Sequence, residues 1–263
     1  MSNSCSARPQ DLPSRILLTV VAIGMSCFAE IAVAQADSSG LFTHQPSNTV
    51  SVNQLLSSDK VLRTAMRARQ LLVEGLLDKA QTEIAKALHA SPNCAIALEI
   101  QGAIHLRTGN LDDAATEFQK AINADSFIGQ AYVGLGMLLI ARSRYKDALV
   151  PLDRAESLLP AAWLVYYETA VANLQLGDLG ATLKHLSLAD NLATDPEQRS
   201  ENAYLRALLL IKSHDFESAT RYMNDAIKFS PNGHNAKPAQ DKIEQIKPLL
   251  EARAALALNK PLP

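Results

Sequence analysis

A short phrase recurs along this chain about every 34 residues and constrains its fold more than any other feature. Three copies, Leu77–Ala80, Leu111–Ala114 and Tyr145–Ala148, end on alanines that are 34 residues apart. A fourth copy is in step at Thr182, and a fifth, Asp215–Ala219, is displaced by three residues. A period of this length is typical of small helical units that bury their apolar faces only by stacking on one another. The length of the chain, 263 residues, therefore counts repeats and not separate domains.

Three positions agree when the units are started at residues 61, 95, 129, 163 and 200. The eighth position is always small: Ala68, Gly102, Gly136, Ala170 and Ala207. The twenty-fourth is always apolar: Ile84, Phe118, Leu152, Leu186 and Met223. The twenty-seventh is always alanine: Ala87, Ala121, Ala155, Ala189 and Ala226. Small residues let two helices approach closely, and the larger apolar residue fills the space beside them. We expect the three-residue insertion in the polar stretch Thr194–Glu197.

The ends of the expected helices are marked by glycine and proline. Glycines suited to a left-handed helix terminus fall between the two helices of three units: Gly75, Gly109 and Gly177. Prolines that stop a helix follow the second helix of three units: Pro92, Pro160 and Pro231. Each unit is therefore predicted to be a helix-turn-helix. The low aromatic content of 5% also favours helices over sandwiches and barrels.

This pattern resembles the tetratricopeptide repeat, a 34-residue helix-turn-helix that stacks into a right-handed superhelix. The resemblance covers residues 61–233 in five units: 61–94, 95–128, 129–162, 163–199 and 200–233. The family's fourth-position aromatic is present only as Tyr132 and Tyr166, and its seventh-position leucine only as Leu135. The resemblance implies an all-α protein, an α-α superhelix or solenoid of about five repeats with a C-terminal capping helix.

Residues 1–34 have the features of an export signal. Arg8 and Arg15 form a positive start, Ile16–Phe28 is an apolar run, and Ala32–Ala34 supplies the small residues of a cleavage site. We therefore expect an exported protein of bacterial type, periplasmic or peripheral in the cell envelope, with no integral membrane span after cleavage.

Two other fates of the N-terminus stay open, an uncleaved signal anchor and a lipoprotein attached through Cys27. Cleavage would leave Cys94 as the single cysteine, so no internal disulfide is expected. Residues 35–60 are predicted to be a flexible linker with a short helical lead-in. Residues 234–263 are predicted to form the capping helix, from Pro238 to about Arg253, and an apolar tail.

The resemblance also implies a candidate partner groove, because in this family the first helix of each unit lines the inside of the superhelix. The candidate groove residues, defined here as the predicted groove set, are Leu62, Arg69, Leu72, Ile96, Glu99, Leu106, Val133, Met137, Ile140, Tyr167, Val171, Leu174, Tyr204 and Leu208. Most of them are apolar. The basic clamp by which some family members hold a C-terminal carboxylate is absent, since only Arg69 is basic at the matching positions. Two alternatives are that the N-terminal lead-in or the C-terminal tail of this chain fills the groove, or that the superhelix is wound tightly enough for these residues to be ordinary core.

Motifs for catalysis or cofactor binding are missing from the sequence. It contains no His-Glu-x-x-His, no Gly-x-Ser-x-Gly and no phosphate-binding Gly-x-x-x-x-Gly-Lys. The six histidines show no metal-ligand spacing on one helix. The net charge of −2 does not favour nucleic acid as a partner. We therefore expect no enzymatic activity, no cofactor and no metal site.

The sequence thus predicts a non-enzymatic scaffold or adaptor for protein partners of an envelope complex, binding an apolar helix or extended segment. Two alternatives remain. One is a glycan-binding or enzyme-associated accessory protein of an exopolysaccharide or secretion system, using Tyr167 and Tyr204. The other is a self-assembling structural protein, and the oligomeric state is not predicted.

Overall fold

The computed structural model of the protein describes residues 59–258, with side chains up to residue 252. The expected signal peptide, the linker and lead-in, and the end of the apolar tail lie outside this range. The described residues form eleven helices and no strand: α4 (Asp59–Val73), α5 (Leu77–Ala90), α6 (Ala95–Arg107), α7 (Leu111–Ala124), α8 (Gly129–Ala141), α9 (Tyr145–Leu158), α10 (Trp163–Leu176), α11 (Leu179–Leu192), α12 (Pro196–Lys212), α13 (Phe216–Phe229) and α14 (Ala236–Leu258). The expected all-α helical solenoid is confirmed.

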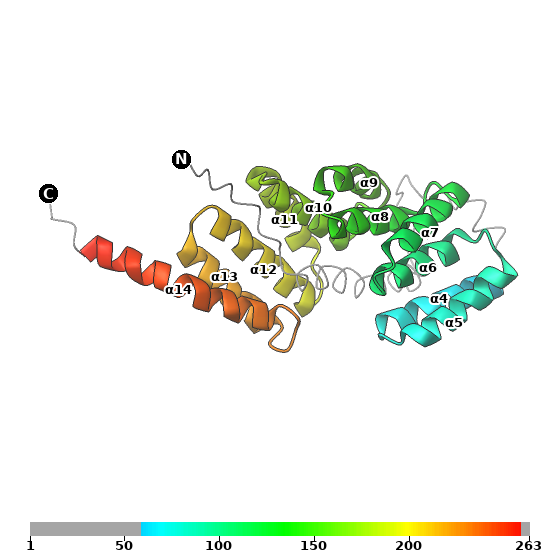
Figure 1. The fold of residues 1–263 in the computed structure, drawn as a ribbon, viewed down its shortest axis with the longest axis horizontal. Helices are drawn as coiled ribbons and strands as arrows, with labels where there is room; N and C mark the ends of the chain where they lie inside the picture. Colours follow the sequence, from blue (N-terminus) through cyan, green and yellow to red (C-terminus); the bar gives the residue numbers. More distant parts are fainter. Residues whose placement is uncertain (1–58, 259–263) are drawn as a thin grey trace, which may run out of the picture.

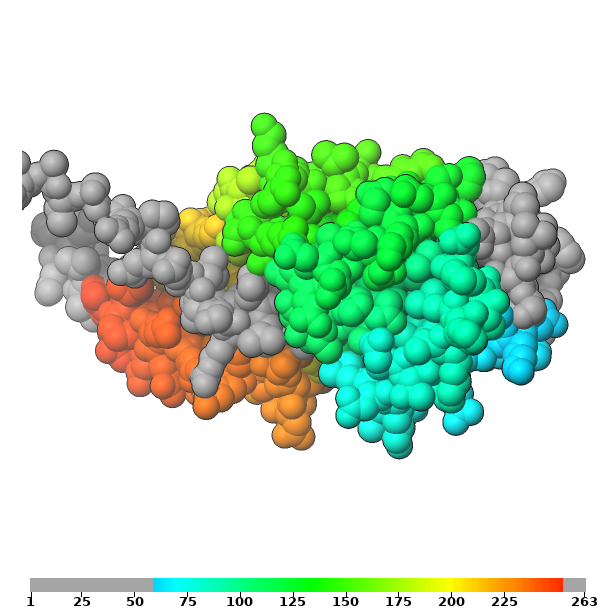
Figure 2. Space-filling view, turned by 45° about the vertical axis from the view of Figure 1, so that its right-hand side comes forward, coloured from blue at the N-terminus to red at the C-terminus, as the bar shows by residue number. Residues whose placement is uncertain are grey.

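The helices pair in chain order, from α4 with α5 to α12 with α13, and α14 follows the last pair (Figure 1). We call the first helix of each pair an A helix and the second a B helix. The pairs succeed one another along an elongated molecule, with α4 and α5 at one end and α14 at the other (Figure 1). In the space-filling view the cyan and green regions also follow one another in chain order, as expected for a stack in which each repeat touches its neighbours (Figure 2).

The A and B helices differ in how they are buried. Each B helix is amphipathic and buries a single stripe, such as Ala80, Ile84 and Ala87 in α5. The A helices of the middle units are apolar on nearly all sides, and in α10 every residue from Trp163 to Leu174 is buried. This difference arises because an A helix packs against its own B helix, the preceding B helix and the neighbouring A helices.

The turns within the units have the backbone that the glycines predicted. Gly75, Gly109 and Gly177 have φ angles of +77°, +80° and +81°. Units three and five place Ser143 and His214 at the corresponding turn, with φ angles of 57° and 61°. Three B helices end two residues before a proline, at Ala90, Leu158 and Phe229, as predicted. Both sets of predicted helix ends are confirmed.

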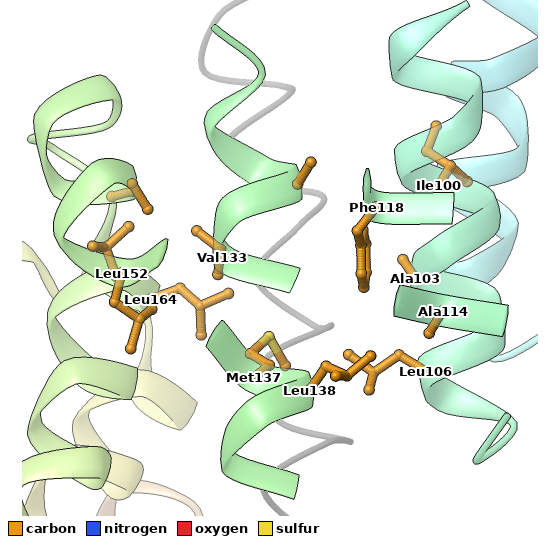
Figure 3. Packing of buried hydrophobic residues seen from close by; sticks show 14 of the residues in the cluster. Ile100, Ala103, Leu106, Ala114, Phe118, Val133, Met137, Leu138, Leu152 and Leu164 are labelled. Carbon is orange, nitrogen blue, oxygen red and sulfur yellow. The ribbon is translucent and has the colours of Figure 1, made fainter. Parts of the chain in front are cut away.

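Phe118 shows how the small positions work. Its ring, from α7, is fully buried and lies between the backbones of α6 and α8 (Figure 3). A Cβ atom added to Gly102 would come within 2.8 Å of the ring, and one added to Gly134 would be closer still. Alanine at either position would therefore collide with Phe118 unless the helices moved apart.

Hydrogen bonds from long side chains tie successive repeats together. Arg107 of α6 donates to the Leu72 carbonyl at the end of α4 over 2.5 Å. Lys212 of α12 donates to the Leu174 carbonyl of α10 over 2.6 Å. Both bonds add a second donor to carbonyls in the last turn of a helix, which also accept from the Gly75 and Gly177 amides.

The three-residue insertion of unit five lengthens a helix. We expected it in the polar stretch Thr194–Glu197, before a unit starting at residue 200. In the structure α12 begins at Pro196 and is 17 residues long, against 13 to 15 for the other A helices. Asp195 caps it by accepting a hydrogen bond of 2.8 Å from the Gln198 amide. The insertion therefore adds a first turn to α12.

The last helix, α14, is longer than predicted. It starts two residues before Pro238 and continues five residues past Arg253, with helix on both sides of Pro248. It packs against α13, and its Ala239 and Ile246 are buried. Ala239 belongs to a small apolar cluster with Ala207 and Met223.

Two further expectations concern a membrane span and the cysteine. Among the described residues no helix combines the length and apolar character that crossing a bilayer requires. Cys94 is free and buried directly before α6.

Candidate partner surface and a polar cluster beside it

All residues of the predicted groove set lie on A helices. They are distributed over α4, α6, α8, α10 and α12, with two or three on each. Neighbouring A helices contact one another along the whole row. The structure therefore brings the set into one continuous row, although the residues span most of the described chain.

None of these residues is exposed in the structure. Ten are buried: Arg69, Leu72, Glu99, Leu106, Val133, Met137, Ile140, Tyr167, Val171 and Leu174. Four are half-buried: Leu62, Ile96, Tyr204 and Leu208. Most of the buried ones belong to the main hydrophobic core cluster, part of which is drawn in Figure 3. We expected an open apolar surface, but the accessible atoms of the row come from the four half-buried residues.

The two charged residues of the set bind each other. The Arg69 Nη2 atom of α4 lies 2.5 Å from the Glu99 Oε2 atom of α6, and the two side chains are only 7% and 1% exposed. Burial raises the pKa of Glu99, although the Arg69 guanidinium acts in the opposite direction. Because its guanidinium already pairs with Glu99, Arg69 is a poor anchor for a partner's carboxylate.

The two aromatic residues of the set are differently placed. The ring of Tyr167 stacks on Trp163, with 4.8 Å between centroids, and the residue is only 4% exposed. Trp163 in turn donates to the Asn202 side-chain oxygen over 3.0 Å, which links α10 to α12. Tyr204 is half-buried, and burial raises the pKa of its hydroxyl. No open pair of aromatic rings is therefore presented to a glycan by these residues.

Glu168 of α10 is a buried acid that no sequence motif indicates. It is completely buried, and neither carboxyl oxygen has a hydrogen-bond partner. Burial alone raises the pKa of Glu168 to about 8. At neutral pH a large fraction of this side chain is therefore protonated.

A polar cluster lies beside the end of the row, where α12 meets the loop before α14. The Nδ1 atom of His234 lies 2.7 Å from Glu197 Oε1, and its Nε2 atom lies 3.9 Å from Glu201 Oε1. Ser230 donates a short hydrogen bond to Glu197. One ligand atom from each of Glu197, Glu201 and His234 can be chosen so that all three lie within 4.8 Å of one another. We call these three residues the Glu-Glu-His cluster.

The charges in the Glu-Glu-His cluster are unbalanced. Burial raises the pKa of Glu201 well above its usual value, and the neighbouring carboxylates of Glu197, Glu168 and Asp195 raise it further. Burial lowers the pKa of His234, while Glu197 acts in the opposite direction. The spacing of the histidines alone does not indicate this cluster, because its residues come from a helix and from a loop that is distant in the sequence. The four-residue spacing of Glu197 and Glu201 on one helix was its only local signal.

A surface pocket on the other side of α12 contains charged residues, two of which form an ion pair with each other. Its volume is about 400 Å³, and it is lined by residues of α11, α12 and α13 and of the link before α12. Arg206 binds Asp190 and lies 5.6 Å from the centre of the Tyr222 ring. The Arg206 and Asp190 charges of this pocket therefore already have partners.

Comparison with known proteins finds a family match for part of the repeats. Residues 65–131 match the family model described as "Tetratricopeptide repeat". A curated relative, BBSome complex member BBS4 from Bos taurus, is 24% identical over 154 residues. The match covers 59% of this chain but only 29% of that protein.

Solved structures share the fold over most of the chain. TTC0263, described as a thermophilic TPR protein in Thermus thermophilus, is 19% identical with a TM-score of 0.60. That comparison covers 70% of this chain and 99% of the other. PilW, described as a widely conserved type IV pilus biogenesis factor, is 14% identical with a TM-score of 0.57, covering 73% and 95% of the two chains. At these identities the comparisons establish the fold alone.

Proposed function

We propose that this chain, a tetratricopeptide repeat protein, is a non-enzymatic scaffold that binds protein partners. The proposal extends to the kind of partner and the compartment. The partner presents an apolar helix or extended segment to the row of A helices, and the complex belongs to the cell envelope.

The apolar character of the A helices is the observation that carries this proposal. The helix α8 contains no charged residue, and nine of its thirteen residues are buried. A helix that is apolar on all sides must be covered on all sides, whereas an amphipathic helix needs cover on one. The repeats cover an A helix from its own B helix and from its neighbours in the row. A partner segment covers the atoms of the row that stay accessible, at Leu62, Ile96, Tyr204 and Leu208, and burial of apolar area, about 25 cal/mol per Å², drives the binding.

Two observations support the envelope as the compartment. The first is the export-signal pattern of residues 1–34, which lies outside the described residues. The second is the similarity of fold to PilW, which is described as a pilus biogenesis factor.

Site-specific photo-crosslinking tests which face binds a partner. A photoreactive amino acid is placed at Ile96 or Leu208, which are half-buried positions of the row. Matched controls place it at Val150 of α9 or Leu183 of α11, which are 74% and 45% exposed on B helices. We expect the two row positions to crosslink to the same partner protein in intact cells, and the two control positions not to do so.

The crosslinked peptides are identified by mass spectrometry, so three outcomes contradict the proposal. Identical partners from both faces would show that the row has no special role. Crosslinks from the row to this chain's own N-terminal or C-terminal residues would identify an internal occupant. Crosslinks to a second copy of the chain would indicate self-assembly.

A reporter fusion tests the compartment separately. Residues 1–40 are joined to an enzyme that is active only outside the cytoplasm. We expect activity from the natural sequence and its loss when Ile16–Phe28 is interrupted by two arginines. Equal activity from both fusions would contradict export through this segment.

A further inference from the structure

We propose that the Glu-Glu-His cluster, formed by Glu197, Glu201 and His234, binds a divalent transition-metal ion through His234 Nε2 and Glu201, with Glu197 orienting the imidazole and Zn²⁺ the best fit. The sequence predicted no metal site, because its histidines show no ligand spacing. The tertiary structure instead combines one histidine with two glutamates from a helix to which the histidine does not belong.

The inserted turn of α12 creates half of this site. Glu197 lies in the extra first turn, and Glu201 lies four residues later, so both project from the same face of the helix. His234 comes from the loop between α13 and α14 and is placed against this face. Gly233 permits the approach, since a Cβ atom there would lie only 2.7–2.8 Å from the two carboxyl oxygens of Glu197.

The buried atoms without partners point to a missing cation. Neither the Nε2 atom of His234 nor the Oε2 atom of Glu201 has a hydrogen-bond partner, and both atoms are inaccessible to solvent. Glu201 as a whole is only 1% exposed. Burying such groups without a partner destabilises the folded state, and more so when the groups are charged. A metal ion bound to His234 Nε2 and to the Glu201 carboxylate would give the nitrogen a partner and balance the charge of the buried acid.

The contact between Glu197 and His234 prepares the ring for a metal. With its Nδ1 proton donated to Glu197 Oε1 over 2.7 Å, the imidazole carries its free electron pair on Nε2. Carboxylates orient metal-binding histidines in the same way in other proteins. The separation of 3.9 Å between Nε2 and Glu201 Oε1 is too long for a hydrogen bond. Two tetrahedral ligands that each lie about 2.1 Å from one zinc ion are about 3.4 Å apart, so a movement of about 0.5 Å would bring both atoms into coordination.

The charges of the Glu-Glu-His cluster favour the binding of a divalent cation. Among the described residues, no lysine or arginine forms an ion pair with Glu197 or Glu201. Two carboxylates and one imidazole therefore share a partly buried space without a permanent positive charge. Zn²⁺ accepts this mixture of nitrogen and oxygen ligands, with water completing its coordination. Mg²⁺ and Ca²⁺ prefer sites made of oxygen atoms only.

The site is open to solvent on one side and joins two elements. The side chains of His234 and Glu197 are 25% and 34% exposed, so an ion has an entry path. A bound ion would fasten the loop before α14 to the first turns of α12. The structural consequence is a closed C-terminal end of the solenoid.

Titration of the full-length, metal-free protein with ZnCl₂, followed by calorimetry, tests the site. Wild type is compared with Glu201→Gln and His234→Gln, and with His89→Gln, which changes an exposed histidine at the end of α5, as the matched control. We expect both cluster variants to bind Zn²⁺ at this site at least tenfold more weakly, and the control to bind as wild type. With Co²⁺, the same variants should lose the visible absorption of a nitrogen- and oxygen-ligated ion.

Two results would overturn the proposal. One is equal Zn²⁺ affinity of wild type and Glu201→Gln. The other is Co²⁺ binding only with the ultraviolet thiolate band, which would place the ion on cysteine. Thermal melting of the metal-free proteins shows that a loss of binding is not a loss of folding, because Glu201→Gln removes a buried carboxylate and should melt at or above the wild-type temperature.

Discussion

Single residues in this protein show how closely its helices pack and where that packing carries a cost. The ring of Phe118 occupies the space that Gly102 and Gly134 leave, so these positions tolerate no side chain larger than hydrogen without movement. Glu168 shows the cost, because a carboxyl group without any hydrogen-bond partner is completely buried in α10. Small positions were visible in the repeat alignment, but the burial of Glu168 was not.

The burial of Glu168 predicts a stability that falls as pH rises. Its pKa is about 8 in the folded protein and near 4.5 in the unfolded chain, so the folded state holds the proton more tightly. This contribution is fully present below about pH 4.5 and is lost as pH rises to about 8. Glu168→Gln should therefore be more stable than wild type at alkaline pH, by up to about 5 kcal/mol, and similar to it in acid.

Urea unfolding of both proteins across this pH range measures the difference. The matched control is Glu244→Gln, which changes an exposed glutamate of α14 and should follow wild type at every pH. The carboxylate of Glu168 also raises the pKa of the nearby Glu201. Glu201 is therefore kept as glutamate in both proteins. A constant difference between Glu168→Gln and wild type at all pH values would contradict the buried, protonated carboxyl.

Helices in this protein are defined by their ends as much as by their faces. The B helices begin directly after a tight turn, and only two of them, α11 and α13, have a side-chain cap. Asp178 accepts a hydrogen bond of 2.8 Å from the Ala181 amide at the start of α11. Asn110 occupies the corresponding position before α7 but makes no such bond.

This difference predicts unequal effects of alanine at two matched positions. Asp178→Ala removes a cap and a negative charge from a helix N-terminus, and should lower the free energy of unfolding by about 0.5–2 kcal/mol. Asn110→Ala should have a smaller effect because no capping bond is lost. Urea unfolding followed by circular dichroism measures both. An equal loss in the two variants would show that the observed cap contributes nothing.

The whole molecule is a stack whose last helix covers its end. The apolar cluster of Ala207, Met223 and Ala239 joins α12, α13 and α14, and Ile246 adds buried area. Repeat stacks need such a cover because an open end presents the apolar face on which another unit would pack.

Removal of residues 236–263 should therefore destabilise the protein and promote association. The loss of apolar contacts at α13 is expected to cost roughly 2–5 kcal/mol. Light scattering should show dimers or larger species, and thermal melting should start at a lower temperature. Deletion of residues 259–263 alone, which leaves α14 intact, is the control. A monomeric truncated protein with an unchanged melt would show that α14 is not a cap.

Much of the architecture followed from the sequence because its causes are local. Small, apolar and alanine positions recur in register, glycines adopt positive φ angles, and prolines end helices within two residues. The longer α12 could not be placed in the same way. A polar segment beginning with Asp195 and Pro196 fits either a loop or a capped first turn, and packing against α13 and the loop before α14 selects the helix.

The repeat pattern by itself determined the helix pairs and their order, since each unit contacts chiefly its neighbours in the sequence. The tertiary structure decided how much of each A helix is covered, because burial depends on helices from three successive units at once. It alone joined Glu197 and Glu201 to His234, and Arg69 to Glu99. The repeat period places Arg69 and Glu99 on adjacent A helices, but no periodicity relates His234 to Glu197 and Glu201, because the loop before α14 lies outside the repeat.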